Sequence, residues 1–319
     1  MTDSLTSKSG LTSQPIERSV VGKGLAHESA LRHVNGEAIY IDDMADLPGT
    51  LHIAPILSTI AKGTIVTIDT AAAMGCDGVV RIVLACDIPG KNEAAPILKN
   101  EPVLADQNVE HIGQIIGAVV AETYAEAHRA AHKVVVEYAE EEPCFDVEEA
   151  YKANSHTHPT QHLVQGDAAG ALDQSTHRFS GRLEMGGQDH FYLEGQVAYA
   201  IPGEDRDMVV WSSTQHPTEV QKLVAEVLDV PMNYVQTEVR RMGGGFGGKE
   251  TQAAQWACLA AVFAKRLKRP IKMRLDRQDD MQLTGKRHDF YGRYRVGFDA
   301  QGKLCAADIE LAGKCGYSP

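Results

Sequence analysis

A run of five glycines in six positions, followed by a lysine and a glutamate, is the part of this chain best suited to chemistry. It comprises Gly243, Gly244, Gly245, Phe246, Gly247, Gly248, Lys249 and Glu250. Glycine gives up side-chain contacts and costs backbone entropy on folding, so such a run suits a backbone that lies against a ligand or takes positive φ. A strand-like segment at 235–239 precedes the run, and a helix-like, largely apolar segment at 251–267 follows it. Because a glycine loop that opens a helix presents free N–H groups to an anion, the sequence predicts a site for a phosphate-bearing cofactor.

The same glycines allow a second interpretation, a dinucleotide-binding unit. Gly243, Gly245 and Gly248 satisfy the spacing G-x-G-x-x-G, and a further strand at 271–275 follows the helix. However, residues 235–240 alternate between apolar and polar side chains. The first strand of such a unit is normally buried on both faces, so the nicotinamide or flavin interpretation is the minor alternative.

A second glycine pair stands beside a polar side chain in the sequence GGQDHFYLE, residues 186–194. Gln188 can both donate and accept a hydrogen bond through its amide. Taken alone, the segment is typical of a bulged strand with Phe191 and Leu193 facing the core. That interpretation does not account for two glycines next to Gln188.

The first part of the chain alternates strand-like and helix-like segments. Strands are expected at 79–85, 114–121 and 134–138, with an alanine-rich helix at 124–132. This is a β-α-β rhythm. It gives way to an acidic run ending at Pro143 and then to a polar stretch, 154–165. The polar stretch carries His156, His158 and His162, and a solvated linker is favoured there over a metal site.

The second part of the chain also mixes helix and strand. Residues 217–228 have apolar side chains at helical spacing, which predicts an amphipathic helix packed on a sheet. Strands at 291–298 and 303–311 flank a four-residue turn and predict a β-hairpin. The chain stops at 316–319 without a helix end or a closing strand, so we expect it to be cut within a domain.

Composition limits the function classes. A length of 319 residues suggests about two domains. The net charge of −12 argues against a nucleic-acid or anionic-membrane surface. Six dispersed cysteines form no CxxC pair, so the chain offers no zinc ribbon or iron–sulfur ligand set. Residues 1–19 are rich in Ser and Thr and are expected to be a disordered tail. Without a secretory or membrane-spanning pattern, a cytoplasmic protein is the default expectation.

The two glycine motifs in this order, GGQDHFYLE and RMGGGFGGKE, resemble the large, molybdenum-binding subunit of the molybdenum hydroxylases, the xanthine dehydrogenase and aldehyde oxidase family. HESALRHVNGEAIYIDD at 27–43, LPGTLHIA at 47–54 and LDRQDDMQLTGKRHDF at 275–290 extend the resemblance over nearly the whole chain after residue 20. The resemblance implies an α+β fold. It places an α/β hammerhead domain at 20–145, a linker at 146–165 and the first part of a molybdopterin-binding domain at 166–319.

The resemblance also implies roles for particular residues. Gly244, Gly245 and Gly247 would let backbone N–H groups approach a molybdopterin cofactor. Gln188 would hydrogen-bond an oxygen ligand of the molybdenum without ligating the metal itself. Phe246 would lie at the edge of the metal; its alternative is a simple packing aromatic.

Glu250 would hydrogen-bond a purine substrate and so take part in catalysis, where aldehyde oxidases tend to have an apolar residue. Its alternative role is a first-turn carboxylate that stabilises the dipole of the following helix. Lys249 is taken as a solvated or structural residue. Asp189 stands where a glutamate is commoner in the family, a minor departure.

The implied activity is hydroxylation of hypoxanthine and xanthine with water as the oxygen source. Electrons would pass through 2Fe-2S clusters and FAD on a partner subunit to NAD. The family's catalytic glutamate base lies near its far C-terminus and is missing here, so we expect a truncated chain that is inactive alone and needs the C-terminal half of the subunit. The alternatives are an aldehyde oxidase-type hydroxylase, a dinucleotide-binding module, or a non-catalytic fragment. In such a fragment, apolar surface on the helix 251–267 and on the open hairpin would promote self-association.

Overall fold

The computed structural model describes residues 21–316, so the tail expected at 1–19 lies outside the described residues. The described residues divide into two compact units, 21–38 and 39–316. In the described part of the first unit, the helix α1 (Ala30–Asn35) ends at Gly36, which has a φ of +81°. That left-handed conformation closes a helix readily at glycine, because glycine has no Cβ to clash.

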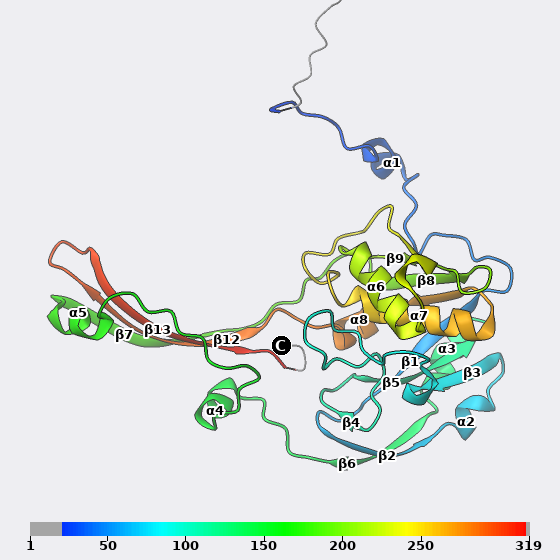
Figure 1. The fold of residues 1–319 in the computed structure, drawn as a ribbon, viewed down its shortest axis with the longest axis horizontal. Helices are drawn as coiled ribbons and strands as arrows, with labels where there is room; N and C mark the ends of the chain where they lie inside the picture. Colours follow the sequence, from blue (N-terminus) through cyan, green and yellow to red (C-terminus); the bar gives the residue numbers. More distant parts are fainter. Residues whose placement is uncertain (1–20, 317–319) are drawn as a thin grey trace, which may run out of the picture. The chain divides into compact units, whose positions relative to one another are not determined.

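The second unit is built on a seven-stranded sheet of order β10-β9-β8-β11-β1-β5-β3 (Figure 1). Its strands are β1 (Leu51–Leu57), β3 (Val79–Leu84), β5 (Ile115–Ala121), β8 (Val197–Pro202), β9 (Met208–Ser212), β10 (Val235–Glu238) and β11 (Ile271–Arg274). β1 runs parallel to β11, with Leu51 opposite Ile271. Strands from both parts of the sequence therefore share one sheet, and the core is continuous across them.

Helices cover both faces of this sheet. α7 (Ala253–Leu267) packs on β8, β9 and β11, and α6 (Pro217–Leu228) packs on α7 and β10. α3 (Tyr124–Ala131) packs on β1 and β5 through small side chains such as Ala127 and Ala130. The helix predicted at 217–228 is confirmed. The one predicted at 251–267 is confirmed as a buried helix that begins at Ala253, so it leaves no apolar surface open for self-association.

The strand arrangement contradicts the dinucleotide-binding alternative. In such a unit the strand after the glycine loop and helix lies beside the first strand. Here β10 is an edge strand paired with β9, and β9 and β8 separate it from β11. The partial exposure of β10 agrees with its alternating sequence, since only Val235 in it is buried.

The segments expected to follow a β-α-β rhythm belong to two different sheets. β5 lies in the seven-stranded sheet, whereas β6 (Val135–Glu140) lies in a small sheet of order β4-β2-β6. The other two strands of that sheet are β2 (Gly63–Asp69) and β4 (Asn108–Val109). The individual strands and the helix are therefore confirmed, but they do not form one parallel unit.

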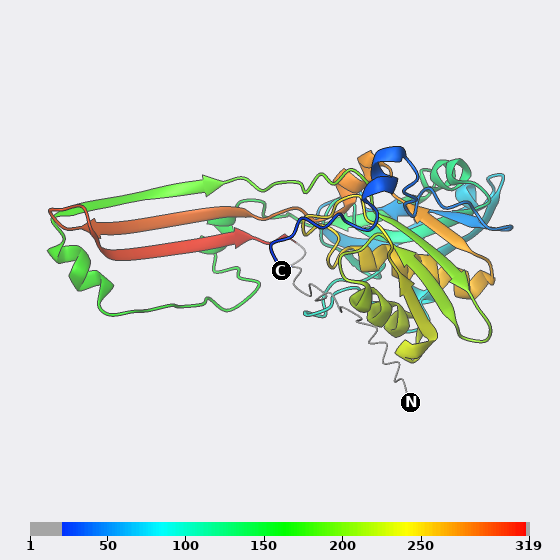
Figure 2. The same ribbon diagram turned by 90° about the horizontal axis from the view of Figure 1, so that it is seen from above.

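A third sheet of order β13-β12-β7 is antiparallel throughout. It consists of β7 (His177–Met185), β12 (Asp289–Phe298) and β13 (Leu304–Lys314). The predicted hairpin is confirmed: Asp299 donates its N–H to the Lys303 carbonyl, and Gly302 takes a φ of +81° in the turn. Figure 2 shows the three strands lying side by side.

The two faces of this third sheet differ in chemistry. Alternation along the strands gathers large apolar side chains on one face, and seven of them are exposed: Phe179, Leu183, Met185, Phe290, Tyr294, Ile309 and Leu311. We call this set the apolar face. On the opposite face, Glu148 of α4 (Val147–Lys152) pairs with Arg182 and Arg293 at 3.0 and 3.1 Å. α5 (Ala168–Gln174) packs on β12 and β13. The segment expected as a linker at 146–165 thus begins with a helix that binds the sheet.

None of the helices in residues 21–316 has the length and apolar character needed to span a membrane.

Asp279 in α8 (Arg277–Leu283) is a carboxylate whose environment disfavours its charge. Burial, together with the nearby Asp276, raises the pKa of Asp279 to about 6. Its nearest cationic candidate, the Nδ1 atom of His128, is 3.8 Å away, and burial lowers the pKa of that histidine. Ionised Asp279 is therefore poorly compensated.

We predict that Asp279→Asn stabilises the fold in a pH-dependent way. Because the folded-state pKa is raised, the native carboxyl costs nothing below its unfolded pKa and becomes destabilising as pH rises through about 6. Urea unfolding should show no gain near pH 4 and a gain of about 1–2 kcal/mol above pH 7. Asp173→Asn, at an exposed aspartate on α5, is the control. A pH-independent effect of Asp279→Asn would contradict the prediction.

Candidate functional site

One edge of the central sheet collects the two glycine motifs. β8 starts there, and β9, β10 and β11 end there, since Ala198 lies opposite Ser212, Glu238 opposite Trp211, and Arg274 opposite Val197. The segment 186–196 leads into β8, and the glycine loop follows β10. Strand order therefore brings together segments that lie far apart in the sequence.

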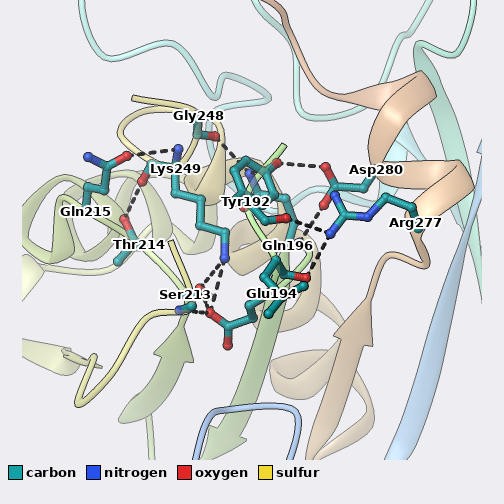
Figure 3. Close-up of polar contacts among 12 residues, drawn as sticks. Tyr192, Glu194, Gln196, Ser213, Thr214, Gln215, Gly248, Lys249, Arg277 and Asp280 are labelled. Carbon is teal, nitrogen blue, oxygen red and sulfur yellow. Dashed lines mark hydrogen bonds and ion pairs between the residues drawn. The ribbon is translucent and has the colours of Figure 1, made fainter. Parts of the chain in front are cut away.

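The two motifs contact each other directly through backbone groups. The Glu194 N–H donates to the Gly243 carbonyl at 3.1 Å, and the Gly243 N–H donates to the Glu194 carboxylate at 2.7 Å. At the other end of the loop, the Gln196 amide donates to the Gly248 carbonyl at 2.9 Å. The glycine loop therefore rests on the segment 186–196 at both of its ends, and Figure 3 shows the Gln196–Gly248 contact.

Lys249 anchors the loop from below. Its side chain is fully buried, and Nζ lies 2.7 Å from Ser213 Oγ and 3.2 Å from Glu194 Oε2 (Figure 3). The Tyr192 ring lies 4.7 Å from the same nitrogen. Burial lowers the pKa of Lys249, and the neighbouring Glu194 carboxylate opposes that shift. The solvated interpretation of Lys249 is therefore wrong, and its structural interpretation is correct.

A second buried cluster fixes the Tyr192 segment to α8. The Tyr192 hydroxyl donates to Asp280 at 2.7 Å, and the Gln196 N–H donates to the other Asp280 oxygen at 2.7 Å. Arg277 donates to the Tyr192 and Leu193 carbonyls at 2.6 and 2.8 Å. Burial raises the pKa of Tyr192, so its hydroxyl keeps the proton that it donates.

The orientation expected for the GGQDHFYLE segment is reversed. Tyr192 faces the core and is buried, whereas Phe191 and Leu193 are 66% and 91% exposed. Phe191 also has a φ of +46°, which interrupts the regular alternation of a strand. The buried bonds of Tyr192 to Asp280 and Gln196 supply the physical reason, because they require this side chain inside.

Gln215, just before α6, shapes the loop from the side. Its side-chain oxygen accepts the N–H of Gly247 at 2.9 Å and that of Lys249 at 3.3 Å. The same oxygen lies 2.6 Å from where a Cβ at position 245 would be. A side chain at position 245 would therefore displace Gln215 from these bonds.

The loop carries unpaired N–H donors in its first half. Within residues 21–316, the N–H groups of Gly244, Gly245 and Phe246 have no hydrogen-bond acceptor. Gly244 has a φ of +94°. Successive N–H groups in such a conformation form a concave site for anionic or oxygen-bearing groups. The residues present therefore fit a cofactor with oxygen acceptors, although the Gly247 N–H is already used by Gln215.

These donors do not belong to a helix N-terminus. The non-helical residues 250–252 separate the loop from α7, whose first residues Ala253 and Ala254 are buried. The expectation that the glycine loop opens the helix directly is thus wrong, and the candidate site is made by the loop backbone itself.

Phe246 points outward from the loop. Its side chain is 65% exposed, so most of the ring is not packed against the described residues. It has a φ of +54°, a conformation that bulky residues rarely adopt. Its carbonyl accepts a hydrogen bond from Arg287 Nη2 at 3.0 Å.

Gln188 is exposed, and Arg287 also fixes its backbone. The Arg287 N–H donates to the Gln188 carbonyl at 2.9 Å. A Cβ at position 187 would lie 2.2 Å from the Arg287 carbonyl oxygen, which accounts for Gly187. Asp189 pairs with Lys286 at 2.8 Å; burial acts to raise the pKa of Asp189, but this contact and the Phe191 N–H hold that pKa below its usual value.

Glu250 is exposed and lies outside the helix. No acidic residue occupies the first turn of α7, so the helix-dipole alternative for Glu250 is wrong. Its charge acts on Glu219, whose pKa is raised mainly by burial and further by Glu250, against the opposing effect of His216. Its carboxylate has no hydrogen-bond partner within residues 21–316 and is available to a ligand.

The sequence interpretation missed Arg287 and Gln215. Arg287 lies in the segment 275–290 that carried part of the resemblance, but no spacing rule assigned it a contact. The histidines at 156–162 form no metal site: no group of three or more His, Cys, Asp or Glu side chains in the described part of the chain is placed to hold a metal.

Two family models match this chain. The aldehyde oxidase and xanthine dehydrogenase a/b hammerhead domain matches residues 35–142, and the molybdopterin cofactor-binding domain matches residues 149–319. The chain therefore belongs to the aldehyde oxidase and xanthine dehydrogenase family of molybdenum hydroxylases. The expected α+β fold, a hammerhead domain followed by part of a molybdopterin-binding domain, is confirmed.

Curated relatives carry both family names. Xanthine dehydrogenase of Oryza sativa subsp. japonica is 42% identical over 307 residues, which cover 93% of this chain and 22% of that protein. Aldehyde oxidase 2 of Macaca fascicularis is 40% identical over 306 residues, which cover 95% of this chain and 22% of that protein. The chain thus spans 22% of the length of these relatives.

Solved structures show the same fold. Aldehyde oxidoreductase from Desulfovibrio gigas has a TM-score of 0.78 at 26% identity, covering 89% of this chain and 33% of that chain. Its counterpart from Desulfovibrio desulfuricans has a TM-score of 0.81 at 23% identity, covering 94% and 35%. The second likeness bears on the fold alone.

We predict that Lys249→Met destabilises the fold by about 3–5 kcal/mol, because it leaves the Glu194 carboxylate charged and unpaired inside the protein. The other Glu194 oxygen, Oε1, already has no partner among the described residues. The double variant Lys249→Met/Glu194→Gln should recover part of the loss. Lys152→Met, which removes an exposed helix pair, should cost less than about 0.5 kcal/mol. Urea unfolding measures all four proteins, and a loss below about 1 kcal/mol for Lys249→Met would refute the role.

Proposed function

We propose that this chain supplies the cofactor-facing loops of a molybdenum hydroxylase subunit that hydroxylates purines, hypoxanthine and xanthine, with water as the oxygen source. The observation that carries the proposal is the set of unpaired N–H donors at Gly244, Gly245 and Phe246, beside exposed Phe246 and Glu250. The match to the molybdopterin cofactor-binding domain over 149–319 supports it.

The residues of the chain would bind and orient the cofactor. The loop N–H groups would donate to its oxygen atoms, and the exposed Gln188 amide would donate to an oxygen ligand of the metal without binding the metal itself. When bound, a molybdopterin cofactor supplies the redox chemistry of hydroxylation. Electrons would then leave through 2Fe-2S clusters and FAD on a partner subunit to NAD.

Glu250 would select the substrate. A carboxylate accepts strong hydrogen bonds from the N–H edge of a purine, whereas a simple aldehyde has no such donor. The side chain is exposed, stands four residues after Phe246, and has no protein partner within the described chain. Its free oxygens are therefore the feature that favours a purine over an aldehyde.

We predict that Glu250→Ala, in the full subunit with its partners, lowers kcat/KM for xanthine by roughly 10- to 100-fold, the worth of a hydrogen bond to a charged group. Molybdenum content should stay near one equivalent per subunit. Glu204→Ala, at an exposed glutamate between β8 and β9, should change neither quantity. Turnover of aldehydes in preference to xanthine would favour the aldehyde oxidase alternative. Absence of molybdenum would favour a non-catalytic fragment.

We further propose that the apolar face docks onto the remaining part of the large subunit. All seven of its large side chains are exposed, and continuous apolar surfaces of this kind mark interaction sites. The curated relatives carry several times more chain than is present here, so the occupant would be a further segment of the same subunit. The charged opposite face already has α4 against it.

Neighbouring residues on β13 allow a matched test, because Ile309 lies on the apolar face and Glu310 on the opposite one. Ile309→Gln should weaken association with a co-expressed C-terminal half about 10-fold, through loss of buried apolar area. Glu310→Gln should leave it unchanged. Co-purification yields and titration by light scattering measure both. Equal effects of the two variants would contradict this docking surface.

A further inference from the structure

Arg287 contacts both segments that carry the proposed cofactor-facing side chains. Its guanidinium Nη2 donates to the Phe246 carbonyl at 3.0 Å, and its own N–H donates to the Gln188 carbonyl at 2.9 Å. We propose that Arg287 is a positioning residue that sets the direction of the Phe246 ring relative to Gln188. We call the bridge formed by these two Arg287 hydrogen bonds the clamp. The clamp is a feature of this chain, and its effect on catalysis rests on the proposed function.

The peptide unit between Phe246 and Gly247 is held at both edges. Its carbonyl accepts from Arg287 at 3.0 Å, and its N–H donates to Gln215 at 2.9 Å. In a trans peptide the carbonyl and the N–H point in opposite directions, so two partners on opposite sides fix the plane. Fixing this plane restricts ψ of Phe246 and φ of Gly247, which is +97°.

Phe246 needs such an external hold. Its φ of +54° is unfavourable for a bulky side chain, and such conformations persist only where the surroundings impose them. Burial of the ring cannot impose it, since the ring is 65% exposed. The φ of Phe246 is therefore maintained by the two hydrogen bonds to the adjacent peptide group. Arg287 makes one of them and Gln215 the other.

The backbone of Arg287 is itself fixed against the Gln188 segment. The close approach of its carbonyl to Gly187 leaves no room for a Cβ, and Asp289 accepts the Gly187 N–H at 2.6 Å. The Arg287 side chain therefore extends from one motif to the other. Removing the side chain should release the glycine loop while the backbone bond to Gln188 stays.

The test uses the full subunit with its partners and three variants. Arg287→Ala removes the clamp, and Arg287→Lys keeps a cationic donor. Arg269→Ala is the control, because Arg269 also donates to a main-chain carbonyl, that of Gly49, at 2.7 Å, and lies away from both motifs, where it binds the Glu122 carboxylate as well. Amide hydrogen exchange is followed in peptides spanning 243–250 and 186–190, together with molybdenum content, kcat and KM.

Arg287→Ala should speed exchange across 243–250 by about 3- to 10-fold, the worth of one hydrogen bond, and leave 186–190 unchanged. KM for the purine should rise by a similar factor, with kcat and molybdenum content nearly constant. Arg287→Lys should restore much of both effects, and Arg269→Ala should show neither. A merely structural role would instead lower molybdenum content and kcat without moving KM.

Unchanged exchange in Arg287→Ala would overturn the proposal, as would equal changes in Arg269→Ala. If the native subunit holds no molybdenum, the proposed function fails, and the exchange data alone then decide whether the clamp exists. The two failures are therefore distinguishable.

Discussion

A loop made mostly of glycine has no side chains with which to hold its own shape, so its conformation depends on polar groups supplied by its neighbours. In this loop the Lys249 side chain is buried, and its ammonium group bonds to Glu194 and Ser213. Burying the Lys249–Glu194 ion pair costs desolvation free energy. Lys249 Nζ and Glu194 Oε2 nevertheless both have hydrogen-bond partners, and these bonds fix the backbone of the loop. Gln215 and Gln196 then fix the individual peptide groups around this anchor.

The anchor is available only because of strand order. The segment with Glu194 leads into β8, Ser213 directly follows β9, and the loop after β10 carries Lys249. All three meet at one edge of the sheet because β8 is antiparallel to β9 while β10 is parallel to it. The same sheet continues through β11 into β1, so the hammerhead strands β1, β5 and β3 extend the platform on which the loop rests. The site and the hammerhead therefore share one core rather than meeting across a boundary.

Local patterns predicted what depends on local physics. The period of 217–228, the turn at 299–302 and the density of glycine at 243–248 each express a constraint carried by neighbouring residues, and each is found. The orientation of Phe191, Tyr192 and Leu193 could not be predicted in this way. It is decided by Asp280, which lies 88 residues from Tyr192 and receives its hydroxyl. Likewise, nothing local distinguishes Lys249 from a solvated lysine, because its burial requires Glu194 and Ser213 from two other segments.

The site has a buried side, where most polar groups are paired, and an open side, where several are not. On the buried side, Lys249 bonds to Ser213 and Glu194, and Gln196 bonds to Tyr192 and to the Gly248 carbonyl. Three successive N–H donors of the loop have no acceptor within residues 21–316. On the open side, Phe246 is exposed in an unfavourable backbone conformation, and Glu250 is exposed near the Glu219 carboxylate. The unpaired donors, the exposed Phe246 and the exposed Glu250 do not stabilise the folded chain. Backbone strain such as that at Phe246 is characteristic of functional sites. The buried hydrogen bonds of Lys249 and Gln196 hold the loop in one conformation. Without them, Phe246 would relax from its unfavourable φ, and the free N–H donors would turn toward water.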